Sequence, residues 1–372
     1  MINDKCLIMN FRFAIISDLH IGLPETIWDS PKRFHLIEVS IPALEKALTH
    51  LEALNLDFLL LPGDLTQHGE PENHSWLQKR LASLPFPAYV IPGNHDVPSL
   101  NATDKCIGLK DFPSYYQDFG YDNPEQLYYT KEIHPGVQLI ALNSNQFDAS
   151  GQQLGCIDQP QLLWLEKVLS QYQNKFIMVM VHHNVVEHLP GQSLHPLGQR
   201  YMLDNAPQLK KLLRRHGVQL IFTGHLHVQD IAQEEELYEI TTGSLVSYPH
   251  PYRILELNTN KLGEKELNIT SHQVKSVPGW ENLPQFSREW MGDRSYPFMM
   301  RLLTDPPLKL PVIEAEKYIA NLRYFWADIA QGDSIFDFPT FPEEISNYFR
   351  GFSAINKEGK PALIDNNTVL KI

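Results

Sequence analysis

Side chains that can bind metal ions or move protons follow an apolar run near residue 90. Residues 88–92 are mainly apolar, and Gly93-Asn94-His95-Asp96 come directly after them. An apolar run with aromatic and β-branched members that stops at Pro-Gly predicts a buried strand and a tight turn. This turn presents an amide, an imidazole and a carboxylate in succession. Because Asn, Asp and Gly are also common turn formers, the segment alone is equally consistent with a purely structural turn.

Four other apolar runs end in the same way. The polar segments that follow them are Ser17-Asp18-Leu19-His20, Gly63-Asp64, His182-His183 and Gly224-His225-Leu226-His227. Asp18 and His20 are two residues apart, so they point to one side if the backbone stays extended. Ligands gather at the carboxyl ends of strands in open α/β sheets. We therefore expect all five segments to contribute to one site.

The residue types in these segments favour two metal ions. Seven nitrogen or oxygen donors are available: Asp18, His20, Asp64, Asn94, His182, His225 and His227. If one carboxylate is shared, each ion has four protein ligands and keeps positions for water and substrate. The lack of cysteine excludes a thiolate zinc site, and four imidazoles argue against Mg²⁺ or Ca²⁺. Mn, Fe, Zn and Co all remain open as the divalent transition metal.

The elements that position these residues indicate a layered α/β fold, because runs of strand length alternate with amphipathic segments of helix length. We expect strands at residues 11–17, 57–62, 88–92, 138–143, 175–181, 218–223, 237–242 and 253–258. We expect helices near 35–55, 72–84, 158–173 and 205–216, with a break or restart at Pro42. The strands between 237 and 258 follow one another without a helix. Two sheets packed face to face, with helices outside, fit this pattern.

The sequence pattern changes at about residue 273. Six prolines between residues 277 and 311 indicate extended covering structure. A helix is expected from about 312 to 330, with an apolar face made by Tyr318, Leu322, Phe325, Trp326 and Ile329. That face could pack on the parent domain, cover the site or form the contact of a homodimer.

The five segments, in this order, resemble the calcineurin-like metallophosphoesterase superfamily. The resemblance covers roughly residues 11–272, and it implies a four-layer α/β/β/α catalytic domain over 1–272 with a C-terminal extension over 273–372. Residues 63–71 and Thr242-Gly243-Ser244 are similar to the branch that contains cyclic-nucleotide and glycerophosphodiester phosphodiesterases.

The resemblance also implies a role for each matching residue. Asp18, His20 and His227 would hold the first metal, Asn94, His182 and His225 the second, and Asp64 would bridge them. A water or hydroxide between the ions would attack phosphorus in line. His95 would stabilise the developing charge and protonate the leaving alkoxide, and Asp96 would orient its ring.

The resulting hypothesis is a phosphodiesterase that hydrolyses a small diester, with a 3′,5′-cyclic nucleotide as the first expectation. The alternatives are a glycerophosphodiester phosphodiesterase or a phosphomonoesterase. A nuclease is disfavoured because the formal net charge of -13 argues against stable binding of nucleic acid. A scaffold without catalysis is disfavoured because no ligand is missing from the set.

Cysteine usage and hydropathy give the expected compartment. Cys6, Cys106 and Cys156 are odd in number and widely spaced, which favours a reducing environment. Residues 6–9 are too short for the apolar region of a signal peptide, and no apolar run approaches the length of a membrane span. We therefore expect a cytoplasmic protein.

Overall fold

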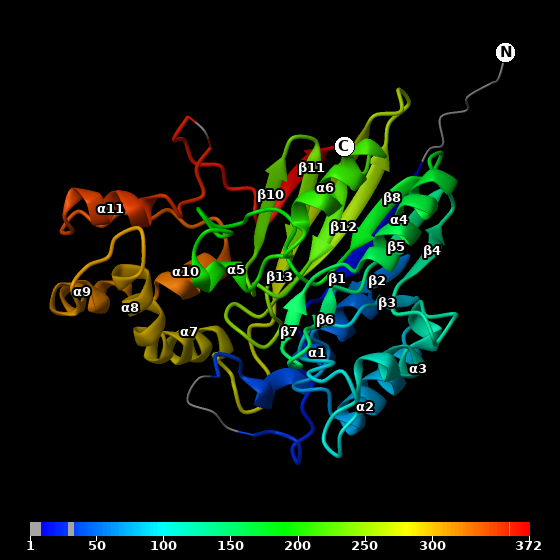
Figure 1. Ribbon diagram of the computed structural model, residues 1–372, viewed down its shortest axis with the longest axis horizontal. Coiled ribbons are helices and arrows are strands. Elements are labelled where there is room, and N and C mark those ends of the chain that lie inside the picture. The colour runs from blue at the N-terminus through cyan, green and yellow to red at the C-terminus, as the bar shows by residue number, and fades with distance from the viewer. Residues whose placement is uncertain (1–8, 29–32, 357) are drawn as a thin grey trace.

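The computed structural model describes residues 9–28, 33–356 and 358–372 of the chain. Cys6 lies outside these residues, whereas Cys106 and Cys156 are free thiols. Two six-stranded mixed sheets form the centre of the molecule (Figure 1). The expectation of a two-sheet α/β/β/α fold is confirmed, and every expected strand is present with shifted ends.

The first sheet has the strand order β14-β13-β12-β1-β2-β3. Its strands are β1 (Asn10–Ile15), β2 (Phe58–Leu61), β3 (Ala88–Val90), β12 (Pro251–Thr259), β13 (Lys265–Gln273) and β14 (Asn367–Lys371). Strands β1, β2 and β3 are parallel, whereas β12, β13 and β14 continue from β1 in antiparallel pairs. The last strand of the chain therefore extends the sheet that the first strand begins.

The second sheet has the order β10-β11-β9-β8-β5-β4. Its strands are β4 (Tyr129–His134), β5 (Val137–Ala141), β8 (Phe176–Met180), β9 (Leu220–Thr223), β10 (Asp230–Glu234) and β11 (Leu237–Thr241). Strands β5, β8, β9 and β11 are parallel. A short hairpin, β6 (Asn145–Phe147) with β7 (Gln153–Gly155), stands apart from both sheets.

Aromatic and aliphatic side chains fill the space between the two sheets. Phe13 on β1 stacks on Phe58 with ring centres 4.9 Å apart and meets Phe222 of the other sheet edge-on at 5.7 Å. Helices α1 (Ser40–Glu52) and α2 (Pro71–Ala82) pack with the first sheet, and α4 (Gln159–Gln171) and α6 (Ala206–Arg215) pack with the second. Small helical elements complete this part: η1 (Ile37–Val39), η2 (Leu109–Asp111), α3 (Phe112–Tyr115), η3 (Gln117–Phe119) and α5 (Pro196–Gln199).

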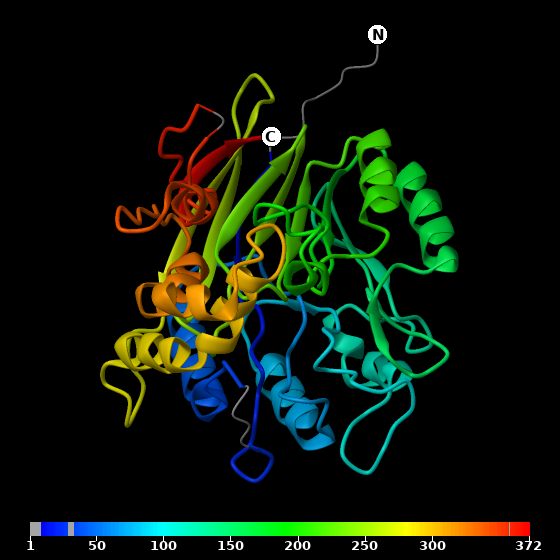
Figure 2. The same ribbon diagram turned by 60° about the vertical axis from the view of Figure 1, so that its left-hand side comes forward.

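The C-terminal helices form a third apolar cluster on the side of the molecule away from α4 and α6 (Figure 2). They are α7 (Leu283–Arg294), α8 (Tyr296–Thr304), α9 (Val312–Ile319), η4 (Ala320–Leu322), α10 (Phe325–Gln331) and α11 (Glu343–Arg350). Leu197, Leu226 and Val228 from the preceding part of the chain join this cluster. The apolar face expected between residues 312 and 330 is thus buried by packing within the chain.

Three local expectations are wrong. The segment 277–311, expected to be extended covering structure, contains helices α7 and α8, because Pro284 and Pro297 lie in the first turns of these helices, where proline is tolerated. The single helix expected over 312–330 is divided into α9, η4 and α10. Helix α1 runs from Ser40 without a break at Pro42, because this proline lies in the first turn, where a missing amide hydrogen costs no helix bond. Within the described part of the chain, no helix combines the length and the hydropathy that crossing a bilayer requires.

Candidate metal centre

The five polar segments follow the central strands β1, β2, β3, β8 and β9 and meet at one end of the two sheets. Backbone hydrogen bonds join them: the His20 amide donates to the Asp64 carbonyl at 2.9 Å, and the Gly224 amide donates to the His182 carbonyl at 3.3 Å. The His225 amide donates to the Asp18 carboxylate at 3.1 Å and so links the two sheets. The fold therefore brings all five segments together.

Five of the seven predicted ligands have a left-handed backbone. The φ angles are 52° at Asp18, 42° at His20, 50° at Asp64, 67° at His225 and 60° at His227. Non-glycine residues seldom adopt this region, and such strain gathers at functional sites. The condition under which Asp18 and His20 would point to one side, an extended backbone, is not met, because the chain turns sharply at both residues.

Two glycines let the backbones of these turns approach each other. A Cβ atom on Gly93 would lie 2.2 Å from the Asp64 carboxylate, and one on Gly224 would lie 2.4 Å from that of Asp18. Neither distance is compatible with a side chain, so any other residue would displace a carboxylate of the site.

The donor atoms form two groups that share Asp64. In the first, the side chains of Asp18, His20, Asp64 and His227 offer atoms that all lie within 4.8 Å of one another. In the second, Asp64, His182 and His225 do the same. The amide oxygen of Asn94 lies 3.2 Å from His182 Nε2 and so adjoins the second group.

The chemistry of these groups fits divalent cations. The Nε2 atoms of His20 and His227 face each other at 3.4 Å, a contact that requires a proton or a cation between them. Asp64 lies 3.4 Å from His182 Nε2 and 3.8 Å from His20 Nε2. Because the neighbours of this carboxylate are imidazoles rather than lysine or arginine, a bound cation would supply the missing positive charge.

Burial and neighbouring charge determine the protonation of the donors. Burial, assisted by His35 and His95, lowers the pKa of His20 well below its usual value. Burial and the neighbouring His183 do the same for the pKa of His225, so both rings stay neutral, the form that binds metal. Burial would raise the pKa of Asp64, but His182 and His95 outweigh it and hold that pKa well below its usual range. Asp64 is thus ionised and able to bind a cation.

Carbonyl groups orient two of the imidazoles. His182 Nδ1 donates to the Pro62 carbonyl at 2.8 Å, which directs Nε2 toward Asp64 and Asn94. His225 Nε2 donates to the Arg200 carbonyl at 3.1 Å, which leaves Nδ1 for the site. Such contacts fix the tautomer of a ligating histidine.

His95 lies beside both groups without belonging to either. Its ring centre is 4.7 Å from that of His20, and its amide donates to Asp64 Oδ1 at 2.8 Å. The expected orienting role of Asp96 is wrong, because His95 Nδ1 donates to the Gln67 carbonyl at 2.8 Å. The Asp96 carboxylate instead accepts from the backbone amides of Leu65, Thr66 and Gly93 at 2.8–3.0 Å.

His35 is a residue of the site that the sequence analysis missed. Its ring centre lies 4.3 Å from that of His20, with 24° between the ring planes, and 4.8 Å from that of His227. It precedes η1 and follows no strand, so a search of strand ends cannot find it. The signal that remains in the sequence is only a histidine fifteen residues after His20.

The comparisons with known proteins identify the family. The sequence profile described as calcineurin-like phosphoesterase matches residues 11–229, more than half of the chain. The chain belongs to the calcineurin-like phosphoesterase family. Members of this family are hydrolases of phosphoric esters and use divalent metal ions, so the expectations of a metallophosphoesterase are confirmed at the level of the family.

Two relatives of this phosphoesterase have phosphodiesterase names. The chain is 29% identical over 191 residues to a probable glycerophosphodiester phosphodiesterase of Arcobacter nitrofigilis, covering 50% of the chain and 62% of that protein. It is 28% identical over 246 residues to a 3′,5′-cyclic-nucleotide phosphodiesterase of Nostoc sp., covering 65% of the chain and 80% of that protein. The chain thus spans less than two thirds of the length of the first relative.

A solved structure supports the fold. A dimetal phosphatase from Danio rerio superposes with a TM-score of 0.51 at 14% sequence identity, covering 71% of this chain and 96% of that one. At 14% identity, this similarity is evidence for a shared arrangement of helices and strands alone.

The loop after His182-His183 in this phosphoesterase borders the second donor group. Tyr201 lies edge-on to His225 with ring centres 5.2 Å apart, and the guanidinium of Arg200 covers the Tyr201 ring at 4.6 Å. His68 lies 6.1 Å from His95. His195 caps α5 by accepting from the Leu197 amide, and so it contributes to the loop rather than to the donor groups.

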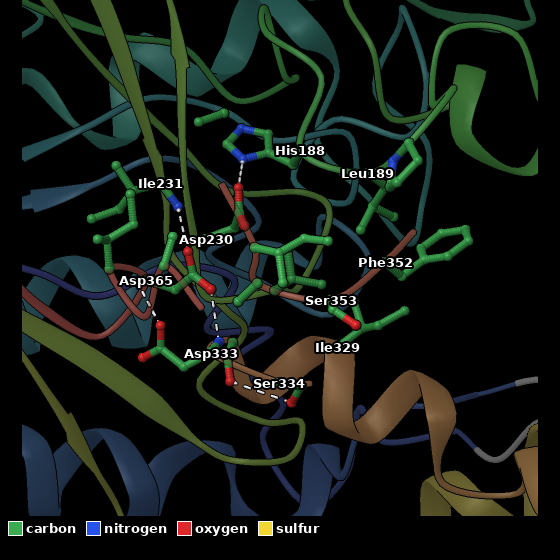
Figure 3. A pocket seen from close by; sticks show the side chains of 18 of the residues that line it. His188, Leu189, Asp230, Ile231, Ile329, Asp333, Ser334, Phe352, Ser353 and Asp365 are labelled. Atoms are coloured by element: carbon green, nitrogen blue, oxygen red, sulfur yellow. Dashed lines mark hydrogen bonds and ion pairs between the residues drawn. The ribbon is translucent and has the colours of Figure 1, made fainter. Parts of the chain in front are cut away.

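A cavity of about 380 Å³ lies between this part of the phosphoesterase and its C-terminal segment (Figure 3). Its polar side chains are largely paired with their neighbours: Asp230 accepts from His188 at 2.5 Å, and Asp365 accepts from the amides of Asp333 and Ile231. Paired groups of this kind hold the C-terminal segment in place. The cavity is therefore a junction, distinct from the two donor groups.

Proposed function

We propose that this chain is a dinuclear metal phosphodiesterase that hydrolyses a small phosphodiester, with a 3′,5′-cyclic nucleotide as the first candidate. A glycerophosphodiester is the second candidate, since one relative has that name. The observation that carries the proposal is the pair of donor groups that share Asp64.

The ligands we propose are those expected from the sequence. One ion would be held by Asp18, His20, His227 and Asp64. The other ion would be held by Asn94, His182, His225 and the same Asp64. Bound ions would supply positive charge to the phosphoryl oxygens and an acidic water as nucleophile.

The chain itself supplies a candidate proton donor. His95 Nδ1 donates to the Gln67 carbonyl, so in the imidazolium form Nε2 would carry the hydrogen that passes to the oxygen of the leaving alkoxide. Two hydrogen bonds fix His95: the ring donates to the Gln67 carbonyl, and the backbone amide donates to Asp64. A donor fixed in this way transfers its proton without first ordering its side chain.

The first test measures metal stoichiometry and diester turnover in the same preparation. We expect the protein to bind two Mn²⁺ or Zn²⁺ ions per chain in calorimetry and to hydrolyse bis(p-nitrophenyl) phosphate faster than the monoester. Asn94→Ala should lower the stoichiometry from two ions to one, because this side chain adjoins the second group alone. A protein that binds metal without turning over any diester would contradict the proposed activity.

Four further assignments complete the proposal. We place the catalytic domain at residues 1–272 and the extension at 273–372. A cytoplasmic location and a lack of stable nucleic-acid binding follow from the sequence arguments. A homodimer is one of the roles that the sequence left open for the C-terminal helices, although their apolar face packs within the chain. Gel filtration with light scattering, and a binding assay with single-stranded DNA at low salt, test the last two.

A further inference from the structure

His35 belongs to a group of potential metal ligands, although none of the five polar segments includes it. Its ring nitrogens form a group with those of His20 and His227 in which one atom from each residue lies within 4.8 Å of the other two. This group shares both of its other imidazoles with the first donor group. His35 therefore adjoins the first of the two ion positions and not the second.

The spacing of the three rings matches coordination of one ion. At a metal–nitrogen distance of about 2.1 Å, two imidazoles at right angles on one ion have ring centres roughly 4.5 Å apart, and at tetrahedral angles roughly 5.3 Å. The observed separations are 4.3 Å for His20 and His35, 4.8 Å for His35 and His227, and 5.3 Å for His20 and His227. The pair expected on the second ion, His182 and His225, has a separation of 4.7 Å.

Ring spacing alone does not identify a ligand. His95 lies 4.7 Å from His20, yet it is 5.9 Å from His35 and belongs to none of the donor groups. His35 meets both conditions at once, since its ring spacing and its nitrogen positions agree with the same ion.

The backbone holds His35 in this position. The amide of Leu36 donates to the Val246 carbonyl at 2.8 Å, and His35 Nδ1 lies 3.5 Å from Ser247 Oγ. On the other side, Phe34 packs on the cluster of C-terminal helices, and the Arg33 guanidinium lies 5.9 Å from the Trp290 ring of α7. In the tautomer in which Nδ1 donates to Ser247 Oγ, Nε2 carries no hydrogen and can bind a metal ion.

We propose that His35 is an additional imidazole ligand of the first ion, completing a set of three imidazoles with His20 and His227. The inference rests on the proposed function, because it requires that the centre binds metal. Imidazole suits zinc, iron and cobalt, whereas manganese prefers oxygen ligands. The first position would therefore favour zinc or cobalt over manganese more strongly than the second position does.

Calorimetric titration of the metal-free full chain with Zn²⁺ and with Mn²⁺ tests this proposal. His35→Ala should still bind two ions, but its affinity for Zn²⁺ at one position should fall about tenfold or more. The affinity for Mn²⁺ should fall less. His68→Ala is the matched control, because the His68 ring lies near the site, 6.1 Å from that of His95, but belongs to none of the donor groups.

A second readout follows the coordination shell directly. The visible absorption of the Co²⁺-loaded protein should change in His35→Ala and stay as in the wild type in His68→Ala. If His35→Ala fails to fold by circular dichroism, His35→Gln serves in both measurements, because its amide keeps bulk but binds zinc more weakly. Wild-type affinities and an unchanged cobalt spectrum in the variant would overturn the proposal, whereas a wild type that binds no ions would overturn the proposed function instead.

Discussion

The His95 side chain offers a sharp test of chemistry at the scale of one residue. It touches the shared Asp64 through its amide and leaves Nε2 free, and it belongs to neither donor group. His95→Ala should therefore slow hydrolysis of a diester with an alkoxide leaving group by about 10²–10⁴-fold. The same change should affect bis(p-nitrophenyl) phosphate much less, because nitrophenolate leaves without a proton.

Metal analysis and two substrates measured on the same sample check this prediction. The ion content of His95→Ala should equal that of the wild type. Equal losses with both substrates would contradict a role as proton donor and would assign His95 to the binding of the phosphoryl group.

The residue types of the centre were predictable from the sequence, but their backbone conformation was not. Asp18 and His20 would point to one side on an extended chain, yet both adopt positive φ. Aspartate and histidine visit this region without a marker such as glycine, so nothing in the sequence distinguishes these positions. His35 was missed for a related reason, because its place beside His20 depends on long-range packing of its loop.

At the scale of elements, Asp96 connects the turns after β2 and β3. Its buried carboxylate accepts from the amides of Leu65, Thr66 and Gly93 and from the Thr66 hydroxyl. In Asp96→Asn one oxygen becomes an amino group, which cannot accept. We expect the free energy of unfolding to fall by about 1–3 kcal/mol for each amide left unpaired.

Urea unfolding of the metal-free protein measures this loss apart from any change in metal affinity. Asp57→Asn is the control, because Asp57 is exposed and accepts from a single backbone amide, that of Arg12. Equal midpoints for the two variants would show that Asp96 has no special role in joining the turns.

The loop after His182-His183 depends on a buried charge. His188 lies between Asp230 and Glu239, at 2.5 and 3.0 Å. Burial would lower the pKa of His188, but Glu239 and Asp230 outweigh it and raise the pKa to about 10. Because the folded-state pKa lies above the usual 6.5, this stabilisation is complete below about pH 6.5 and is lost as pH rises through about 10.

His188→Gln should therefore destabilise the protein strongly at pH 6.5 and much less at pH 10. Urea unfolding of wild type and variant across this pH range tests whether the difference between their free energies of unfolding becomes smaller. His216→Gln provides a control for general effects of losing a histidine. A difference that stays constant with pH would show that His188 is not charged in the folded protein.

At the scale of the whole molecule, periodicity predicted the sandwich but not the way in which the chain closes it. The parallel central strands are continuous apolar runs, so β1, β2, β3, β5, β8, β9 and β11 were found. Strands β13 and β14 have polar sequences because each has an exposed face. They pair with each other although their residues lie about 100 positions apart in the chain. The local sequence pattern carries no information on such long-range pairing. The boundary between a catalytic domain and an extension at residue 272 stays a prediction.

The strand β14 depends on contacts that cross between distant parts of the chain. Asp365 and Asp333 bind each other's amides at 2.7 and 2.9 Å, and Asp365 also accepts from the Ile231 amide at 3.4 Å. The buried guanidinium of Arg253 donates to the Asp365 carbonyl. Asp365→Ala removes the carboxylate from this junction and leaves the amides of Asp333 and Ile231 without it.

We expect Asp365→Ala to loosen the end of the chain while the donor groups stay intact. Hydrogen exchange of β14 and of its partner β13 should accelerate by about tenfold or more, which corresponds to roughly 1–3 kcal/mol for a buried amide left unpaired. Exchange in β8 and β9 and the metal content should not change, because these strands lie in the other sheet. Asp337→Ala is the control, since Asp337 makes only a 3.6 Å ion pair with Arg350 at the surface. If exchange accelerated equally in both sheets, the junction would support the whole sandwich rather than the C-terminal strand.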